Sequence, residues 1–75
     1  MPRLTASERR LRQKLAANSR RLREQAELTL EEAAHRAGIH WRHWQKIESG
    51  EVNLTLASLA RVADALHVEA GRLFE

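Results

Sequence analysis

The sequence contains no cysteine and no tyrosine, one proline, three glycines, and only three Phe or Trp residues among 75. Without cysteine the chain forms no disulfide and offers no thiolate to a metal ion. The scarcity of glycine and proline leaves long stretches free of helix-breaking residues. No apolar run is long enough to span a membrane or to act as a secretory signal. We therefore expect a small helical protein of the cytoplasm that does not bind membranes.

The length allows one small domain but no separate catalytic or effector-binding domain. A domain of this size without covalent or metal cross-links often gains stability from a partner subunit. The serines at positions 7, 49 and 58 and the four histidines suggest no nucleophile and base pair, because a catalytic triad needs a pocket that so small a domain cannot build. We expect no enzyme activity, no cofactor and no small-molecule ligand.

Charge is unevenly distributed along the chain. Residues 1–23 carry eight Lys or Arg residues and one acidic residue, whereas residues 24–75 carry five basic and nine acidic residues. A basic front half favours a polyanionic partner, with nucleic acid ahead of an anionic membrane surface. The alternative interpretation is an arginine-rich helix that is simply well solvated.

Apolar residues recur at steps of three and four, which predicts helices throughout. The first helix is expected over 6–26, with Thr5 and Glu8 as a capping box at its start. Its apolar stripe contains Leu11, Leu15, Leu22 and Ala26. The segment is either one long helix or a short helix followed by the domain's own first helix, starting near Lys14.

A second helix is predicted over 30–37. Thr29 and Glu32 have the spacing of a capping box, and three alanines give this helix a small inward face. Gly38 ends it, because glycine tolerates a positive φ. A third helix follows over 41–49 and is ended by Gly50. We expect Trp44 and Ile47 to face inward, leaving an outward side that contains Trp41, Arg42, Gln45 and Lys46.

The fourth helix is predicted over 56–66, between a cap at Thr55 and a left-handed residue at His67. Its apolar face contains Leu56, Leu59, Val62, Ala63 and Leu66. A last short helix is expected over 70–74. Part of the apolar surface near this helix is expected to remain for a partner subunit, involving Val68, Leu73 and Phe74.

The most informative stretch is 28–50, which reads LTLEEAAHRAGIHWRHWQKIESG. It contains a capped helix, a three-residue turn that begins with glycine, and a second capped helix. Two helices joined in this way cross steeply, and the second projects from the body. A projecting helix with Arg and Lys on its outer side fits the major groove of DNA.

This stretch resembles the XRE family, the helix-turn-helix group of lambdoid phage repressors and Cro. The resemblance continues through VNLTLASLARVADALHVEAGRLF and covers about residues 15–74. It implies a compact, all-α bundle of five helices of the lambda-repressor type over residues 15–75, preceded by a basic extension at 1–14 that is expected to be helical. It also implies a homodimer that binds a palindromic operator in double-stranded DNA and regulates transcription. The C-terminal part of this sequence is similar to that of the small controller proteins of restriction-modification systems.

The resemblance also implies roles for individual residues. The positions that read bases are Trp41, Arg42, Gln45 and Lys46. The positions that contact the DNA backbone or a base are His40, which caps the recognition helix, and His43, Thr29, Leu30, Ser49, Asn53 and Thr55. An ion pair between Arg23 and Glu48 would tie the first helix to the end of the recognition helix.

The sequence departs from the family pattern at several positions. Leu30 stands where glutamine often donates to a phosphate, so backbone amides at that helix end would have to hold the phosphate. Glu51 places a negative charge in a loop that is often basic. Ser19 places a hydroxyl in or near the core, and Trp41 replaces a small polar or basic residue. The basic extension would supply phosphate contacts that Leu30 and Glu51 give up.

Some alternatives stay open. The Trp41 indole would either press on a thymine methyl group or sugar, or fold back onto the protein. His40 and His43 have a His-x-x-His spacing, but no further ligand lies nearer than His35 and Glu48, so we expect no metal site. The competing functions are a protein-binding module, such as an antitoxin or a coactivator-type bridge, and nonspecific binding of nucleic acid or membrane through the basic extension.

Overall fold

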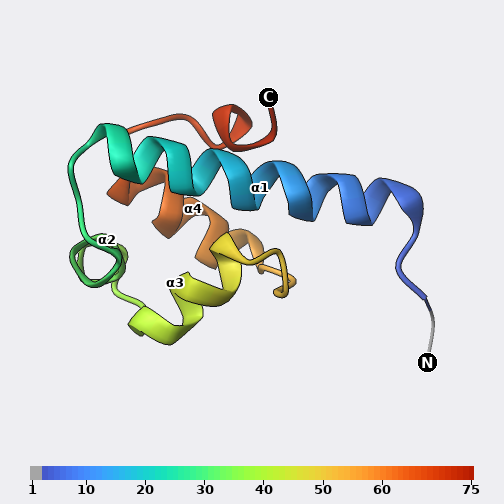
Figure 1. Ribbon diagram of the computed structural model, residues 1–75, viewed down its shortest axis with the longest axis horizontal. Coiled ribbons are helices and arrows are strands. Elements are labelled where there is room, and N and C mark those ends of the chain that lie inside the picture. The colour runs from blue at the N-terminus through green and yellow to red at the C-terminus, as the bar shows by residue number, and fades with distance from the viewer. Residues whose placement is uncertain (1–2) are drawn as a thin grey trace.

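The computed structural model describes residues 3–75, and over that range the chain is built from helices and short loops without a strand (Figure 1). The elements are α1 (Ala6–Gln25), α2 (Leu30–Ala37), α3 (Trp41–Glu48), α4 (Leu56–Ala65) and the 3₁₀-helix η1 (Ala70–Phe74). The all-helical fold is therefore confirmed. The expected fifth α-helix is instead a short 3₁₀-helix, in which the Arg72 amide donates to the Glu69 carbonyl three residues back at 2.9 Å. Met1 and Pro2 of the expected basic extension lie outside the described residues.

Helix α1 is one continuous helix of 20 residues, which settles the choice between one long helix and two shorter ones. The Thr5 hydroxyl accepts from the Glu8 amide at 3.0 Å. The Glu8 carboxylate pairs with Arg12 at 3.4 Å, so the reciprocal half of the expected capping box is not made. The first turns of α1 project beyond the other helices (Figure 1). The helix therefore runs without a break through the residue where the basic extension was expected to end.

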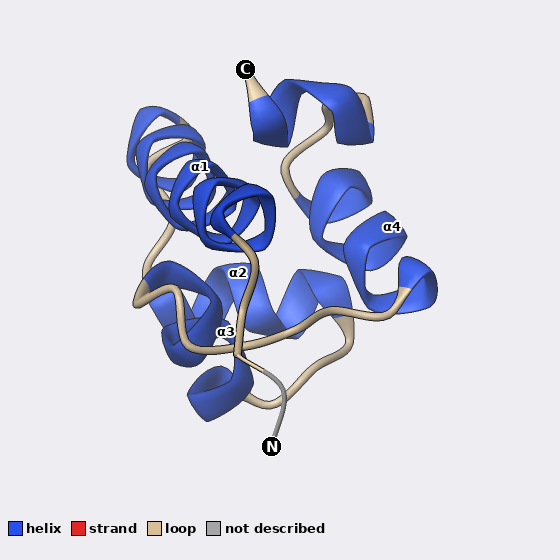
Figure 2. Ribbon diagram, turned by 90° about the vertical axis from the view of Figure 1, so that its right-hand side faces the viewer, coloured by secondary structure: helices blue, strands red, loops and turns tan. Residues whose placement is uncertain are grey.

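The helices enclose one core: α1 packs against α3 and η1, α2 packs against α3 and α4, and α4 packs against η1. Figure 2, which looks along α1, shows α2 and α3 below this helix and α4 and η1 to its right. Trp44, Ile47, Val62 and Leu73 are the largest apolar side chains that are fully buried. The Asn18 amide donates to the carbonyls of Leu73 and Glu75 at 3.0 and 3.1 Å, which ties η1 to α1.

Three residues expected on buried stripes are exposed. Leu11 is 50% exposed because it belongs to the projecting part of α1, and Ala26 is exposed because it caps the far end of that helix. Leu56 is 84% exposed because it is the first residue of α4, ahead of the turns that reach the core. Leu73, by contrast, is fully buried, so it offers no surface to a partner subunit.

Ser19 is buried in the core, as the sequence predicts. His67 adopts a φ of 56°, and so ends α4 in the left-handed conformation expected of it. No helix in the described part of the chain is both long enough and apolar enough to cross a membrane.

Candidate nucleic-acid interface

A short turn fixes the direction of α3. The predicted capping box at the start of α2 is complete: the Thr29 hydroxyl accepts from the Glu32 amide, and the Glu32 carboxylate accepts from the Thr29 amide at 2.8 Å. Gly38 ends α2 with a φ of 69°, a conformation that costs glycine nothing but strains other residues. The Ile39 amide then donates back to the Ala34 carbonyl at 3.0 Å, and the Ile39 side chain packs against the core. The chain therefore enters α3 in a defined direction.

The inner side of α3 is held in the core. Trp44 and Ile47 are 0% and 1% exposed. Since residues three and four apart share one side of a helix, this anchoring turns the opposite side of α3 outward. The residues exposed on that side are Trp41, Arg42, Gln45 and Lys46.

A network of hydrogen bonds around Glu48 fastens the end of α3 to α1. The Arg23 guanidinium donates to both carboxylate oxygens of Glu48, from Nε at 2.6 Å and from Nη2 at 2.9 Å. The Trp44 indole Nε1 donates to the same carboxylate at 2.5 Å, a contact that the sequence pattern did not predict. The hydrogen bond to Glu48 raises the pKa of Arg23, against the opposing effect of burial. Arg23 also donates to the Leu28 carbonyl at 2.9 Å, so one side chain joins α1, the following loop and α3.

The N-terminus of α3 carries a continuous surface of three side chains. His40 caps the helix, and its Nδ1 atom accepts from the Arg42 amide at 3.0 Å. The imidazole stacks on the Trp41 indole with ring centroids 5.7 Å apart. The Arg42 guanidinium carbon lies 5.3 Å from the centre of the Trp41 ring, in a cation–π contact. Trp41 therefore contacts its neighbours and still remains 40% exposed.

His43 is half-buried one turn further along α3. Within residues 3–75, no three His, Asp or Glu side chains come together in a way that could hold a metal ion.

The polar residues at the other helix ends are engaged in local hydrogen bonds. The Ser49 hydroxyl donates to the Lys46 carbonyl at 2.9 Å. Thr55 caps α4 by accepting from the Ser58 amide at 3.0 Å, and its hydroxyl donates to the Ser58 hydroxyl at 3.2 Å. Asn53 is exposed in the loop between α3 and α4. The two hydroxyl hydrogens thus already have acceptors within the protein.

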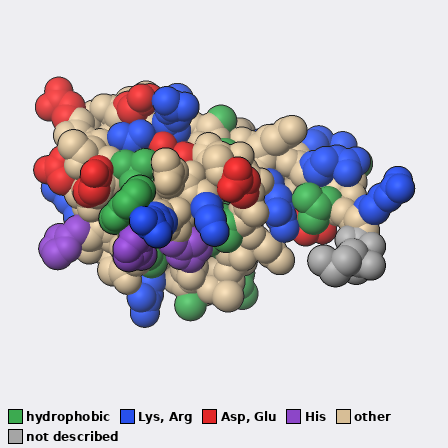
Figure 3. All heavy atoms as spheres, turned by 60° about the horizontal axis from the view of Figure 1, so that its bottom comes forward, with side chains coloured by type: hydrophobic (Ala, Val, Ile, Leu, Met, Phe, Trp, Pro, Cys, Tyr) green, Lys and Arg blue, Asp and Glu red, His purple; other side chains and the backbone are tan. Residues whose placement is uncertain are grey.

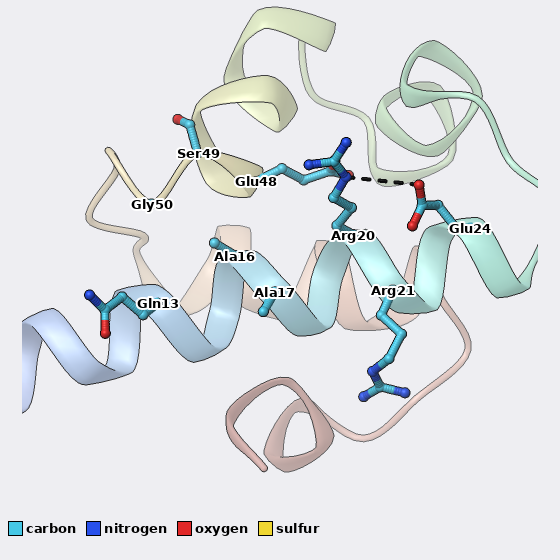
Figure 4. Close-up of a pocket in the computed structure, with 9 residues that line it drawn as sticks. All are labelled: Gln13, Ala16, Ala17, Arg20, Arg21, Glu24, Glu48, Ser49 and Gly50. Carbon is cyan, nitrogen blue, oxygen red and sulfur yellow. Dashed lines mark ion pairs between the residues drawn. The ribbon is translucent and has the colours of Figure 1, made fainter.

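A basic residue of α1 that the sequence did not single out lies beside the end of α3. Arg20 lines two adjoining hollows together with Glu48 and Ser49, and Gln45 lines one of them. Figure 4 shows the larger hollow, of about 460 Å³, with the Arg20 side chain pointing toward α3 and Arg21 pointing away from it. Arg20 pairs weakly with Glu24, at 3.8 Å, and both side chains are more than half exposed. The available signal was its position one turn before Arg23, which places both on one side of α1.

The face that presents α3 is rich in basic and histidine side chains. Figure 3 turns this face toward the viewer, and histidine, Lys and Arg side chains lie together on it over α2 and α3. Further Lys and Arg side chains gather at the end where α1 begins, while most of the acidic side chains in view lie toward the opposite end. The surface around α3 is therefore suited to an anionic ligand.

Comparisons with known proteins identify the family. Residues 14–74 match the model of a family described as a helix-turn-helix domain. Among solved structures, the restriction-modification controller protein C.AhdI from Aeromonas hydrophila is similar, with 28% identity and a TM-score of 0.81 over 84% of this chain and 96% of that one. The clp gene regulator ClgR from C. glutamicum has 27% identity and a TM-score of 0.77, over 84% of this chain and 82% of its own.

The hypothetical transcription factor NHTF from Neisseria is 30% identical, with a TM-score of 0.84 over 99% of this chain and 83% of its own. No curated protein sequence matches this chain. The match to the family model and these structural likenesses agree with the motif in residues 28–50. The chain therefore belongs to the XRE-type helix-turn-helix family.

Proposed function

We propose that the chain is a sequence-specific regulator of transcription, a repressor or autoregulator that binds a palindromic operator in double-stranded DNA as a homodimer. The observation that carries this proposal is the division of α3 into two sides. Trp44 and Ile47 fix the inner side in the core, and the outer side is left free with polar and basic groups. Such a helix, rigidly held and exposed along one side, fits the major groove.

The exposed side of α3 has the chemistry to distinguish base pairs. Arg42 can donate twice to the O6 and N7 atoms of guanine, and Gln45 can bridge N6 and N7 of adenine. Lys46, on the same side, is a second donor for guanine. Trp41 presents an apolar ring that suits a thymine methyl group. Since Arg42 rests on this ring in the free protein, the two residues would engage DNA as a unit.

Groups around α3 would hold the phosphate backbone. The Arg20 side chain points from α1 toward the end of α3 (Figure 4). It lines a hollow together with Gln45, so it would bind a phosphate that passes there. The start of α2 offers the Leu30 amide, whereas the Thr29 amide would contact a phosphate only by giving up the Glu32 carboxylate. His40, His43 and Asn53 are further candidates. Ser49 and Thr55 would contact a phosphate only by giving up their present hydroxyl acceptors. The basic first turns of α1 would add phosphate contacts of their own.

Two copies would be needed for a palindromic site. A homodimer would place its two copies of α3 about 34 Å apart, one turn of DNA, in successive major grooves. The chain would then read each half-site with the same four side chains.

The test is selection of bound sequences from a random DNA pool, carried out with the wild type and with Arg42→Ala. We expect the wild type to select a palindrome, and the variant to lose preference at one base pair of each half-site, worth about 1–3 kcal/mol. Arg72→Ala is the matched control, because Arg72 lies on η1, away from α3 (Figure 1). If the DNA molecules that the wild type selects share no common sequence, the proposal is wrong.

A further inference from the structure

An apolar groove lies at the end of the molecule where α1 projects. It has a volume of about 190 Å³ between α1, the loop after α3, α4 and η1, and apolar side chains supply most of its lining. Those residues are Leu11, Leu15, Val52, Leu54, Leu59 and Phe74. Leu11 is half exposed, and the loop residues, Leu59 and Phe74 are only partly buried. Water therefore reaches apolar surface that a small domain would otherwise cover.

Leu56 extends this apolar surface along α4. It precedes Leu59 by three residues, so the two side chains share one side of the helix. Its 84% exposure is the highest among the large apolar side chains found exposed in the described part of the chain. A largely exposed leucine beside an open groove suits a contact in which that leucine is covered by another molecule.

The groove opens away from the exposed side of α3, and of the individual residues proposed to contact the DNA backbone only Asn53 lines it. Figure 2 views the molecule from the end where α1 begins, and the first turns of α1 and the loop after α3 come forward there, while α3 lies at the lower edge. In Figure 1 the same end is at the right and α3 is at the bottom. A molecule bound in the groove would therefore lie beside α3 and leave its exposed side free.

The charges beside the groove have both signs. Glu8 and Arg12 line it together, and they form only a long ion pair with each other, at 3.4 Å. Arg12 donates to the Glu51 carbonyl at a similarly long 3.4 Å, while its Nε atom is buried without a hydrogen-bond partner among the described residues. A surface that carries one acid and one base is self-complementary about a two-fold axis, because each group of one copy can meet the opposite group of the other. A uniformly acidic or basic peptide would leave one of the two charges unmatched.

We propose that this groove is the surface through which two copies of the chain pair, with Leu11 and Leu56 of each copy covered by the other. The inference rests on the homodimer of the proposed function and gives that dimer its contact surface. A two-fold axis that runs parallel to the outward direction of α3 would let both copies present this helix to the same DNA duplex.

The first test measures self-association without DNA, by analytical ultracentrifugation of the full chain. Leu11→Gln and Leu56→Gln should each weaken dimerisation at least tenfold. Ala26→Gln, an exposed change at the opposite end of α1, should leave it unchanged. Both leucines are exposed, so the helical circular dichroism and the unfolding midpoint should stay close to those of the wild type. The proposal that the groove is the dimer interface would be wrong if the wild type stays monomeric at all concentrations. It would also be wrong if the leucine variants dimerise as the wild type does.

The second test uses the absence of cysteine from the chain. Leu11→Cys introduces a single thiol, and a short bis-maleimide should join two such chains efficiently. Ala26→Cys should give little cross-linked product under the same conditions. Equal yields from the two variants would contradict the proposal.

These measurements separate the groove from DNA reading. If both leucine variants dimerise as the wild type does, the groove is not the dimer interface, and the proposed role of α3 is unaffected. If dimerisation depends on the leucines but the protein selects no DNA sequence, the groove is supported as the dimer interface and the proposed regulatory function is wrong.

Discussion

The carboxylate of Glu48 accepts hydrogen bonds from Arg23 and from the Trp44 indole, and its side chain is only 8% exposed. Arg23 is 13% exposed at its side chain, so removal of the acid leaves a cation with little access to water. The same acid lies at the end of α3, so it adds to the anchoring of that helix by Trp44 and Ile47.

We predict that Glu48→Ala lowers the free energy of unfolding by about 3–5 kcal/mol, because a buried charge loses its partner. Chemical denaturation followed by circular dichroism measures this. Glu24→Ala is the control, since the exposed pair of Glu24 with Arg20 is expected to contribute at most about 1 kcal/mol. A similar loss of unfolding free energy in both variants would show that the Arg23–Glu48 pair does not behave as a buried ion pair.

Ser19, unlike Glu48, is a buried polar residue whose side chain lacks a hydrogen bond within residues 3–75. Its side chain is fully buried, and its hydroxyl has no hydrogen-bond partner among the described residues. A buried hydroxyl without a partner destabilises the folded state, and alanine also has the higher helix propensity. Ser19→Ala should therefore raise the free energy of unfolding by about 1 kcal/mol or more, measured by denaturation. The exposed Ser7→Ala serves as control, and a destabilised Ser19→Ala would mean that the hydroxyl does have a partner.

At the scale of elements, the start of α2 should respond to pH. The hydrogen bond from the Thr29 amide, followed by that from the Thr29 side chain, lowers the pKa of Glu32 below its ordinary value of 4.5. A lowered folded pKa means that the capping box stabilises the fold above the unfolded pKa. That stabilisation is lost as the pH falls through the lower, folded pKa.

Glu32→Gln should therefore remove part of the acid sensitivity of the protein. We expect the wild type to lose more of its thermal stability between pH 7 and pH 3 than the variant does. The neighbouring Glu31→Gln, which does not take part in the capping box, controls for the change in net charge. Parallel pH curves for the wild type and Glu32→Gln would contradict this role.

At the scale of the whole molecule, DNA affinity should depend steeply on salt, because basic side chains from α1 and α3 would displace cations from the phosphates. Arg20→Gln should reduce the slope of log affinity against log salt by about 1, the loss of one phosphate contact. It should weaken all DNA sequences alike. Arg72→Gln, on the face away from α3, should leave the slope unchanged. Fluorescence anisotropy at several salt concentrations measures both, and an unchanged slope for Arg20→Gln would remove Arg20 from the interface.

The helix ends could be predicted from local sequence. The box between Thr29 and Glu32, the left-handed Gly38 and the left-handed His67 all depend on residues within one or two turns of each other. The inward side of α3 could also be predicted from the sequence, because the period of a helix places Trp44 and Ile47 together. For the same reason the outward position of Arg42 followed from the sequence, although its role toward DNA remains a proposal.

The sequence by itself determined the helical class, the turn between α2 and α3, and the division of α3 into a buried and an exposed side, because each of these is set by neighbours along the chain. Only the tertiary structure decided that Leu11 and Leu56 stay exposed beside a groove, that Arg20 points toward the end of α3, and that Trp44 joins Arg23 on Glu48. These features depend on how segments far apart in the sequence pack, and helical periodicity contains no information about which helix covers which.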